Sequence, residues 1–244
     1  MPALYTVQRV LSVLQGGNTD REKGAESMYK ACIFDLDGTL TDTLDSLTYS
    51  VNETMKETGL PQITREQCRM FVGNGAKVLI QKSLEAAGVS EEEFFPRTFQ
   101  AFRRIFDKNC TYRVKPYEGI VSLLSELKAR DIKLGVLSNK PDRQAVHVVS
   151  RIFGENIFDI VWGQKEGVPR KPDPSALLLM AEKLGADPSE IIYIGDSEVD
   201  VQTGQAAKVK TVLVSWGFRG PEDLRKAGAE LIVNSTEEIL KITN

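Results

Sequence analysis

Short, continuous apolar runs alternate with helical patterns from Lys30 onward, and this alternation constrains the fold more than any other feature of the chain. Strands of a parallel sheet are buried on both faces, so they are apolar throughout, and helices connect them. The pattern therefore predicts an α/β protein with a Rossmann-like, doubly wound parallel sheet as its core. The six runs that carry this prediction are residues 31–34, 132–137, 157–161, 191–194, 209–214 and 231–233.

The long segment after the first run, residues 42–113, contains no comparable apolar run and has the pattern of several helices. Capping-box spacings that begin at Thr64 and Ser90 predict two helix starts within it. We therefore expect an all-helical domain inserted into the core. The expected boundaries are residues 45–112 for the inserted domain and residues 28–44 with 113–244 for the core.

Residues 1–27 precede the first run and are expected to form an N-terminal extension and linker. Residues 1–14 have the apolar spacing of a short helix, and Gln8 and Arg9 interrupt any stretch resembling a signal peptide. We expect this extension to be dispensable for catalysis. No apolar run of the chain approaches the ~20 residues needed to cross a bilayer, so we expect no membrane span.

Charge and cysteine content limit the partners and the compartment. The chain has 31 Lys and Arg against 34 Asp and Glu, a net charge of -3, which provides no general basic field for nucleic acid. Any anionic ligand must be bound by local groups. Cys32, Cys68 and Cys110 are widely spaced and form no Cys-x-x-Cys pattern, which argues against disulfides and thiolate zinc sites. We expect a cytoplasmic protein in which Cys32 is a buried, unreactive thiol; the oligomeric state is left open.

Acidic side chains follow two of the predicted strands at the point where each strand ends. Ligands of open parallel sheets bind at the carboxyl ends of the strands. Asp35 and Asp37 follow the first run with an i, i+2 spacing, which points both side chains to the same side of an extended chain, and Asp196 follows the fourth run. Three converging carboxylates form an all-oxygen set that suits a hard divalent cation, and Mg²⁺ is the natural candidate.

Polar groups at the other strand ends complete a phosphate-binding pattern. Ser138 and Asn139 follow the second run and offer neutral hydrogen-bond donors, and Lys171 provides a cation next to the rigid turn at Pro172. A carboxylate nucleophile that attacks phosphorus divides phosphate ester hydrolysis into two steps. Mg²⁺ and Lys171 would neutralise the charge on the phosphoryl oxygens.

The order of these residues resembles the four motifs of the haloacid dehalogenase-like phosphatase superfamily. The resemblance covers the chain from about Met28 and implies that the inserted helical domain is a cap of that superfamily's first type. The residues that carry it are Asp35-x-Asp37-Gly38-Thr39, Ser138, Lys171 before Pro172, and Gly195-Asp196-Ser197-x-x-Asp200.

The resemblance also implies a role for each motif residue. Asp35 would be the nucleophile that forms an aspartyl phosphate, and Asp37 the general acid that protonates the leaving oxygen and then activates water. Ser138 and Asn139 would bind the phosphoryl group, and Lys171 would pair with both the nucleophile and the phosphate. Mg²⁺ would be held by the Asp35 carboxylate, the Asp37 main-chain carbonyl and Asp196, with Asp200 in support. Asp200 could also simply cap the following helix.

Contrasts within the superfamily narrow the expected reaction. Dehalogenases and phosphonate-cleaving members lack an acid at the position of Asp37, so this residue favours phosphate ester chemistry. Sugar phosphomutases carry a His early in the cap, whereas the only His here is His147, in the core region, to which we assign no catalytic role. Residues 35–40, 72–76 and 138–141 look most like those of phosphoglycolate phosphatases.

The same resemblance points to a turn of the inserted domain as a substrate-specificity loop. Gly73, Asn74 and Gly75 tolerate positive φ and predict a tight turn. Together with Lys77 they are candidates to cover the substrate. Each also has a purely structural interpretation: the triplet as a turn, and Lys77 as a solvated helix residue.

The leading hypothesis is a magnesium-dependent phosphatase that acts on a small phosphorylated metabolite such as 2-phosphoglycolate. Hydrolysis of a nucleotide, pyrophosphate or sugar phosphate, or phosphomutase activity, is the alternative within the same superfamily. A phospho-Asp signalling module or a binding protein is the alternative of a different class. Receiver domains place the phospho-acceptor on a later strand and the Lys last, whereas here Lys171 precedes Asp196.

Overall fold

A six-stranded, wholly parallel sheet with the order β5-β4-β1-β6-β7-β8 forms the core of the computed structural model, which describes residues 29–244. The extension, linker and dispensability expected for residues 1–27 lie outside the described residues. The sheet confirms the predicted α/β class, and each of the six predicted runs overlaps one strand. The strands are β1 (Ala31–Phe34), β4 (Lys133–Pro141), β5 (Ile160–Gln164), β6 (Ile191–Gly195), β7 (Lys210–Val214) and β8 (Ile232–Val233).

In the third apolar run, the apolar residues begin before the strand does. We predicted a strand over residues 157–161, but β5 begins at Ile160. Ile157 and Phe158 precede the strand, but both belong to the hydrophobic core, and their exposed fractions are only 5% and 8%. Burial alone therefore accounts for the apolar start of this run.

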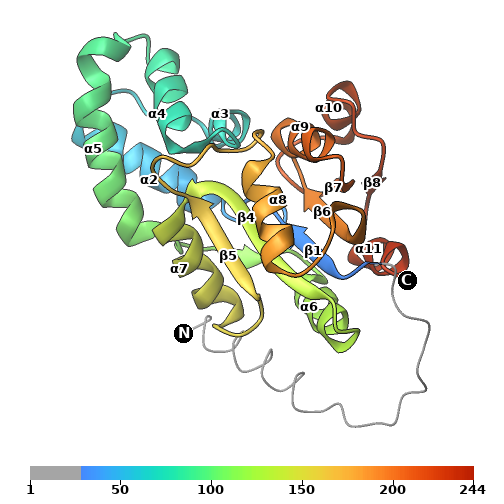
Figure 1. The fold of residues 1–244 in the computed structure, drawn as a ribbon. Helices are drawn as coiled ribbons and strands as arrows, with labels where there is room; N and C mark the ends of the chain where they lie inside the picture. The colour runs from blue at the N-terminus through green and yellow to red at the C-terminus, as the bar shows by residue number, and fades with distance from the viewer. Residues whose placement is uncertain (1–28) are drawn as a thin grey trace.

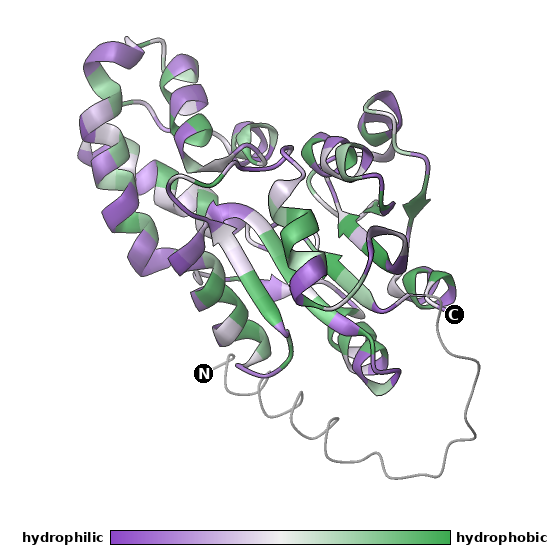
Figure 2. Ribbon diagram, in the orientation of Figure 1, coloured by the Kyte–Doolittle hydropathy of each residue, from purple (hydrophilic) through white to green (hydrophobic). Residues whose placement is uncertain are grey.

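Helices cover both faces of the sheet (Figure 1). Ala31 and Ile33 of β1 pack in one cluster with Leu177, while Cys32 and Phe34 belong to the cluster on the opposite side. Figure 2 shows the corresponding hydrophobic colouring along the central strands. One layer contains α8 (Ser175–Lys183), α9 (Glu198–Ala207) and α10 (Pro221–Lys226), and the other α6 (Ile120–Ala129), α7 (Asp142–Phe153) and α11 (Thr236–Ile242). A 3-10 turn (Pro188–Glu190) precedes β6.

The inserted segment is all helical and projects from one end of the core (Figure 1). Thr64 and Ser90 cap α3 and α5 through bonds from backbone amides to their hydroxyls, as the sequence predicts. The helices are α2 (Leu44–Glu57), α3 (Arg65–Phe71), α4 (Gly75–Ala86) and α5 (Glu91–Asn109). Within residues 29–244, no helix is long and apolar enough to cross a membrane.

A short antiparallel pair, β2 (Thr41–Asp42) with β3 (Lys115–Pro116), stands where the chain leaves the core and where it returns. Thr41, Asp42 and Lys115 are polar and produce no apolar run, so the sequence did not predict these two strands. The pair lies close to the boundaries that we propose between the core and the inserted domain, residues 44/45 and 112/113. It holds both ends of the insertion together next to the strand ends.

Candidate active site

The predicted motif residues meet at the carboxyl end of the three central strands. Phe34 of β1 is in register with Val136 of β4 and with Ile194 of β6, so Asp35 and Gly195 follow at the same level, beside β4, which continues to Pro141. The amide of Asp35 continues the ladder by donating to the Ile194 carbonyl at 2.8 Å. Asp196 follows β6 directly. The sheet register therefore brings together acids that are far apart in the sequence.

A cavity of about 40 Å³ lies between this edge of the sheet and the inserted helices. Its two walls differ in chemistry. The charged side chains come from the core: Asp35, Asp37, Lys140, Asp196 and Arg219. The side chains from the inserted helices and the turn after α3 are apolar: Leu47, Val72, Ala76, Leu79, Phe102 and Phe106. The arrangement provides a charged floor for a phosphoryl group under an apolar lid.

Lys171 joins two of the buried acids. Its Nζ lies 3.1 Å from Asp35 Oδ1 and 2.8 Å from Asp200 Oδ1, and it also contacts the Tyr193 hydroxyl at 3.0 Å. Burial alone would lower the pKa of Lys171, but the charges of Asp200 and Asp35 outweigh it and raise this pKa above its usual value. Lys171 therefore remains a cation in the buried site.

Asp200 acts as a buried acceptor whose two oxygens are already occupied. Oδ1 accepts from Lys171 and from the Tyr193 hydroxyl, and Oδ2 accepts from the Ser197 hydroxyl at 2.7 Å and from the amides of Ser197 and Asp196 at 3.1 and 3.2 Å. Burial raises the pKa of Asp200, but Lys171 and these donors outweigh it and hold the pKa below its usual value. Ser197 and Asp200 also form the capping box of α9, so the structural interpretation of Asp200 holds, and its supporting role toward a metal stays a prediction.

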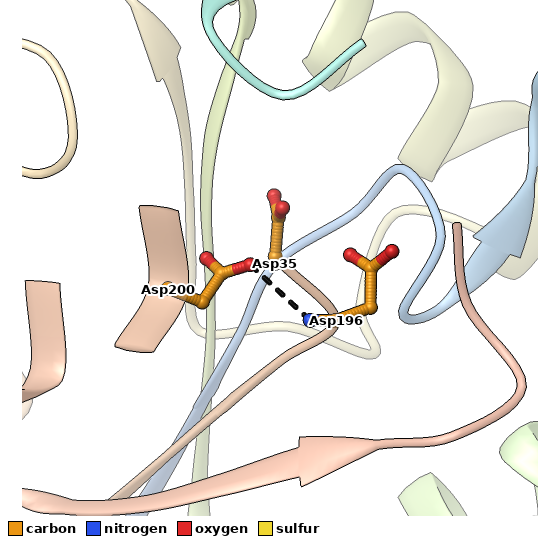
Figure 3. A group of neighbouring side chains, drawn as sticks. All are labelled: Asp35, Asp196 and Asp200. Carbon is orange, nitrogen blue, oxygen red and sulfur yellow. Dashed lines mark hydrogen bonds between the residues drawn. The ribbon is translucent and has the colours of Figure 1, made fainter. Parts of the chain in front are cut away.

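Three of the buried acids lie so close together that their ionised forms favour binding of a cation. Asp35, Asp196 and Asp200 each place one carboxylate oxygen within 4.8 Å of the others, and Figure 3 shows Asp35 between the other two. Burial, with help from Asp200 and Asp37 and against the effect of Lys171, raises the pKa of Asp35 to about 7. Burial, Asp200 and Asp35 raise the pKa of Asp196 well above its usual value.

Counting formal charges gives the same result. When all are ionised, Asp35, Asp37, Asp196 and Asp200 carry four negative charges, and Lys140 and Lys171 pair with them as two positive ones. The site therefore has an excess of two negative charges. An all-oxygen donor set with this excess fits a hard divalent cation.

Asn139 connects the core to the inserted domain. Its Nδ2 donates to the carbonyls of Gly73 and Lys171, each at 3.0 Å, and its Oδ1 accepts from the Lys171 amide at 3.0 Å. The side chain is thus engaged in positioning Lys171 and the turn at Gly73. Ser138 lines the cavity, and its hydroxyl oxygen accepts a hydrogen bond from the Lys140 amide at 3.3 Å.

The predicted specificity turn reaches the cavity only in part. Gly73 and Gly75 line it and adopt the predicted positive φ values of 122° and 83°. Asn74 does not line it, and Lys77 is exposed outside it. His147 is exposed on α7, also outside the cavity.

Two cations of the cavity, Lys140 and Arg219, had no role predicted from the sequence. Lys140 lies two residues after Ser138 and pairs with Asp37. Arg219 follows β7, whose carboxyl end lies at the same edge of the sheet, so its place after the fifth apolar run could have suggested it.

The guanidinium group of Arg219 binds main-chain carbonyls of the inserted domain. Its Nη1 and Nη2 donate to the carbonyls of Arg69 and Val72 at 2.8 and 2.7 Å, while its Nε donates to Glu198 Oε2 at 2.8 Å. These carbonyls lie at the C-terminal end of α3, where helix carbonyls lack intrahelical partners. The neighbouring Phe218 amide donates to Asp196 Oδ2 at 2.7 Å. One loop therefore holds both a site acid and the inserted domain.

Comparison with known proteins agrees with this geometry. Residues 32–214 match the model of the haloacid dehalogenase-like hydrolase family. Phosphoglycolate phosphatase of Rhodospirillum rubrum is 34% identical over 197 residues, covering 78% of this chain and 81% of the relative. N-acetylmuramic acid 6-phosphate phosphatase of Pseudomonas aeruginosa is 31% identical over 215 residues, covering 87% and 94%. A crystal structure of a predicted phosphoglycolate phosphatase from Haemophilus somnus superposes with a TM-score of 0.83 at 27% identity, covering 90% and 100%.

A parallel sheet that presents paired acids and a lysine beneath inserted helices defines a class of phosphoric monoester hydrolases, and the matching relatives are phosphatases of this class. The chain belongs to the haloacid dehalogenase-like hydrolase family, in its phosphoglycolate phosphatase-like branch. Family membership and the phosphatase relatives leave no support for the signalling alternative.

Proposed function

We propose that the protein is a Mg²⁺-dependent phosphatase that hydrolyses small phosphomonoesters through an aspartyl phosphate on Asp35. The observation that carries the proposal is the environment of Asp35. Its Oδ1 is held by Lys171 at 3.1 Å and by the Leu36 amide at 2.7 Å, while the residue lines the cavity. The carboxylate is thus fixed at the floor of the cavity, where an oxygen can attack phosphorus.

The reaction would proceed in two steps. An Asp35 oxygen attacks phosphorus, the bond to the ester oxygen breaks, and Asp37 gives its proton to the leaving alcohol. Asp37 then takes a proton from a water molecule that attacks the same phosphorus. The bond between phosphorus and the Asp35 oxygen breaks, which regenerates the carboxylate and releases inorganic phosphate. Lys171 stabilises the negative charge of the phosphoryl oxygens throughout.

The carboxylates of Asp35 and Asp196 and the main-chain carbonyl of Asp37 would hold the Mg²⁺. Bound there, the ion would neutralise charge on the phosphoryl oxygens. Asp200, with both oxygens occupied, would support the ion indirectly by fixing Lys171 and the Asp196 amide. Main-chain and side-chain donors at Ser138 and Asn139 would complete the phosphate site.

The small volume of the cavity favours a compact substrate. A volume of about 40 Å³ corresponds to only a few water molecules, so this position of the inserted helices favours a small leaving group over a sugar ring. We propose 2-phosphoglycolate as the first substrate to test. Turnover of an amino-sugar phosphate such as that named for the Pseudomonas aeruginosa relative would need a more open arrangement. Cys32, Cys68 and Cys110 are all buried free thiols, which supports the reducing cytoplasmic compartment that we propose.

Phosphate release from a panel of phosphorylated compounds tests the proposal. The panel contains 2-phosphoglycolate, a nucleoside monophosphate, pyrophosphate and an amino-sugar 6-phosphate, each with Mg²⁺ and with a chelator. We expect Mg²⁺-dependent release with preference for the smallest ester. Release from every compound without a divalent cation would contradict the metal assignment, and preference for the amino sugar would contradict the substrate assignment.

A further inference from the structure

Lys140 is a buried lysine that contacts both the core and the inserted domain at the cavity. Its side chain is 1% exposed. Its Nζ lies 2.9 Å from Asp37 Oδ1 and 3.2 Å from Asp37 Oδ2, and it sits 4.8 Å from the ring centroid of Phe106 on α5. A single ammonium group is thus placed between a motif acid of the core and an aromatic ring of the inserted helices.

These contacts fix the Asp37 carboxylate. Both hydrogen bonds that the described residues give to its oxygens come from Lys140. Two bonds from one donor restrict rotation of the carboxylate about its own axis and hold it in the floor of the cavity, which it lines. Buried ammonium groups are stable only when paired, so the side chains of Lys140 and Asp37 depend on each other.

We propose that Lys140 is the positioning residue for Asp37, the acid–base group of the reaction; this inference rests on the proposed function. Lys140 holds the Asp37 carboxylate where it can reach the leaving oxygen and, in the second step, the attacking water. The face of Phe106 covers the ammonium from the side of the inserted domain, so the correct placement of Asp37 depends on α5 lying over the site.

A direct contact between Lys140 and the substrate is the competing role. The geometry argues against it, because the ammonium already faces both Asp37 oxygens and is covered by Phe106. Lys140 therefore has little surface to offer a ligand. The two roles predict different kinetics: a positioning residue changes kcat through Asp37, whereas a substrate contact changes KM.

The variant Lys140→Met tests the proposal, because methionine has a similar length, carries no charge and packs well against an aromatic ring. Lys226→Met, which changes an exposed lysine of α10, is the matched control. Two substrates are compared: an alkyl ester, 2-phosphoglycolate, and 2,4-dinitrophenyl phosphate, whose leaving group needs no proton.

With the alkyl ester we expect Lys140→Met to lower kcat about 100-fold, with KM changed by less than about threefold. With dinitrophenyl phosphate we expect a rapid burst of one equivalent of phenolate at close to the wild-type rate, followed by slow turnover, because only the second step then needs Asp37. Lys140→Arg should restore part of kcat. Equal losses of the burst rate and of alkyl ester turnover, or a raised KM with unchanged kcat, would overturn the proposal.

A double-variant comparison separates action through Asp37 from a general effect on the fold. If Lys140 acts through Asp37, then Lys140→Met changes the slow turnover of Asp37→Asn by less than about threefold. Multiplying losses would contradict this. Wild type and Asp35→Asn are measured alongside. Activity that survives Asp35→Asn overturns the proposed function and this inference together, whereas loss in Asp35→Asn with full activity in Lys140→Met overturns the inference alone.

Discussion

Lys171 Nζ lies 3.1 Å from Asp35 Oδ1, and both side chains are almost completely buried at the end of the sheet. A second acid, Asp200, holds the same ammonium at 2.8 Å. The lysine is therefore fixed from behind by a residue of α9 and presents its charge to Asp35. This pairing connects the stability of the core to the chemistry of the site, and the first two predictions test it.

Replacing Lys171 by methionine should remove turnover and destabilise the fold. The change leaves Asp35 and Asp200 without their cation in a buried site, and breaking a buried pair in this way costs about 3–5 kcal/mol. Urea unfolding and phosphate release measure the two effects. Lys183→Met, at an exposed lysine of α8, is the control that should change neither. An unchanged unfolding midpoint in Lys171→Met would contradict the buried pairing.

Asp200→Asn should lower turnover even though Asp200 offers no free oxygen to a ligand. The asparagine keeps the shape but replaces an accepting oxygen by a donor, so either Lys171 or the Ser197 group loses its partner. We expect a loss of about 3 kcal/mol in unfolding free energy and at least a tenfold loss in kcat. Full activity with reduced stability would show that Asp200 serves the fold alone.

Arg219→Met should weaken the contact between the core and the inserted domain. Each bond from the guanidinium to a carbonyl of α3 is worth about 1.5–3 kcal/mol, so the inserted helices should spend less time over the site. We expect KM for a small phosphomonoester to rise about tenfold. Arg225→Met, at an exposed arginine of α10, is the control. The same KM in both variants would contradict a role for Arg219 in holding the inserted domain.

The cysteines should be unreactive until the protein unfolds. Burial raises the pKa of Cys32 to about 12 and that of Cys68 to about 11, and it also raises the pKa of Cys110. A raised pKa lowers the thiolate fraction at any pH below it, and the thiolate is the reactive form. At pH 8 we expect a thiol reagent to label three groups in urea and none rapidly in the folded state. Rapid labelling of any cysteine in native buffer would contradict this.

The parallel core was predictable because strands that are buried on both faces appear in the sequence as unbroken apolar runs. All four residues of β1 are fully buried, so none of them could be polar, and the strand appears as an unbroken apolar run. The pair β2 and β3 was not predicted, because Thr41, Asp42 and Lys115 are polar and produce no apolar run. The predicted start of β5 was three residues too early, because Ile157 and Phe158 are buried but lie outside the strand.

The grouping of the candidate site residues was predictable wherever the end of a strand determines where a residue lies. Asp35 and Asp196 follow strands whose register the apolar runs imply, and the structure brings them together with Lys171 and Asp200. The contacts of Arg219 depend on where the inserted helices lie over the core. Spacing along the chain carries no information about that, which is why its role appears only in three dimensions.

The identity of the phosphorylated residue tests the central claim most directly. The Asp37→Asn variant is mixed with 2,4-dinitrophenyl phosphate and Mg²⁺, quenched in acid and digested, and its peptides are analysed by mass spectrometry. Because the second step needs Asp37, the account predicts that a phosphoryl group accumulates on Asp35 and is absent from Asp35→Asn. A phosphoryl group on another residue, or phenolate release in Asp35→Asn at the wild-type rate, would contradict it.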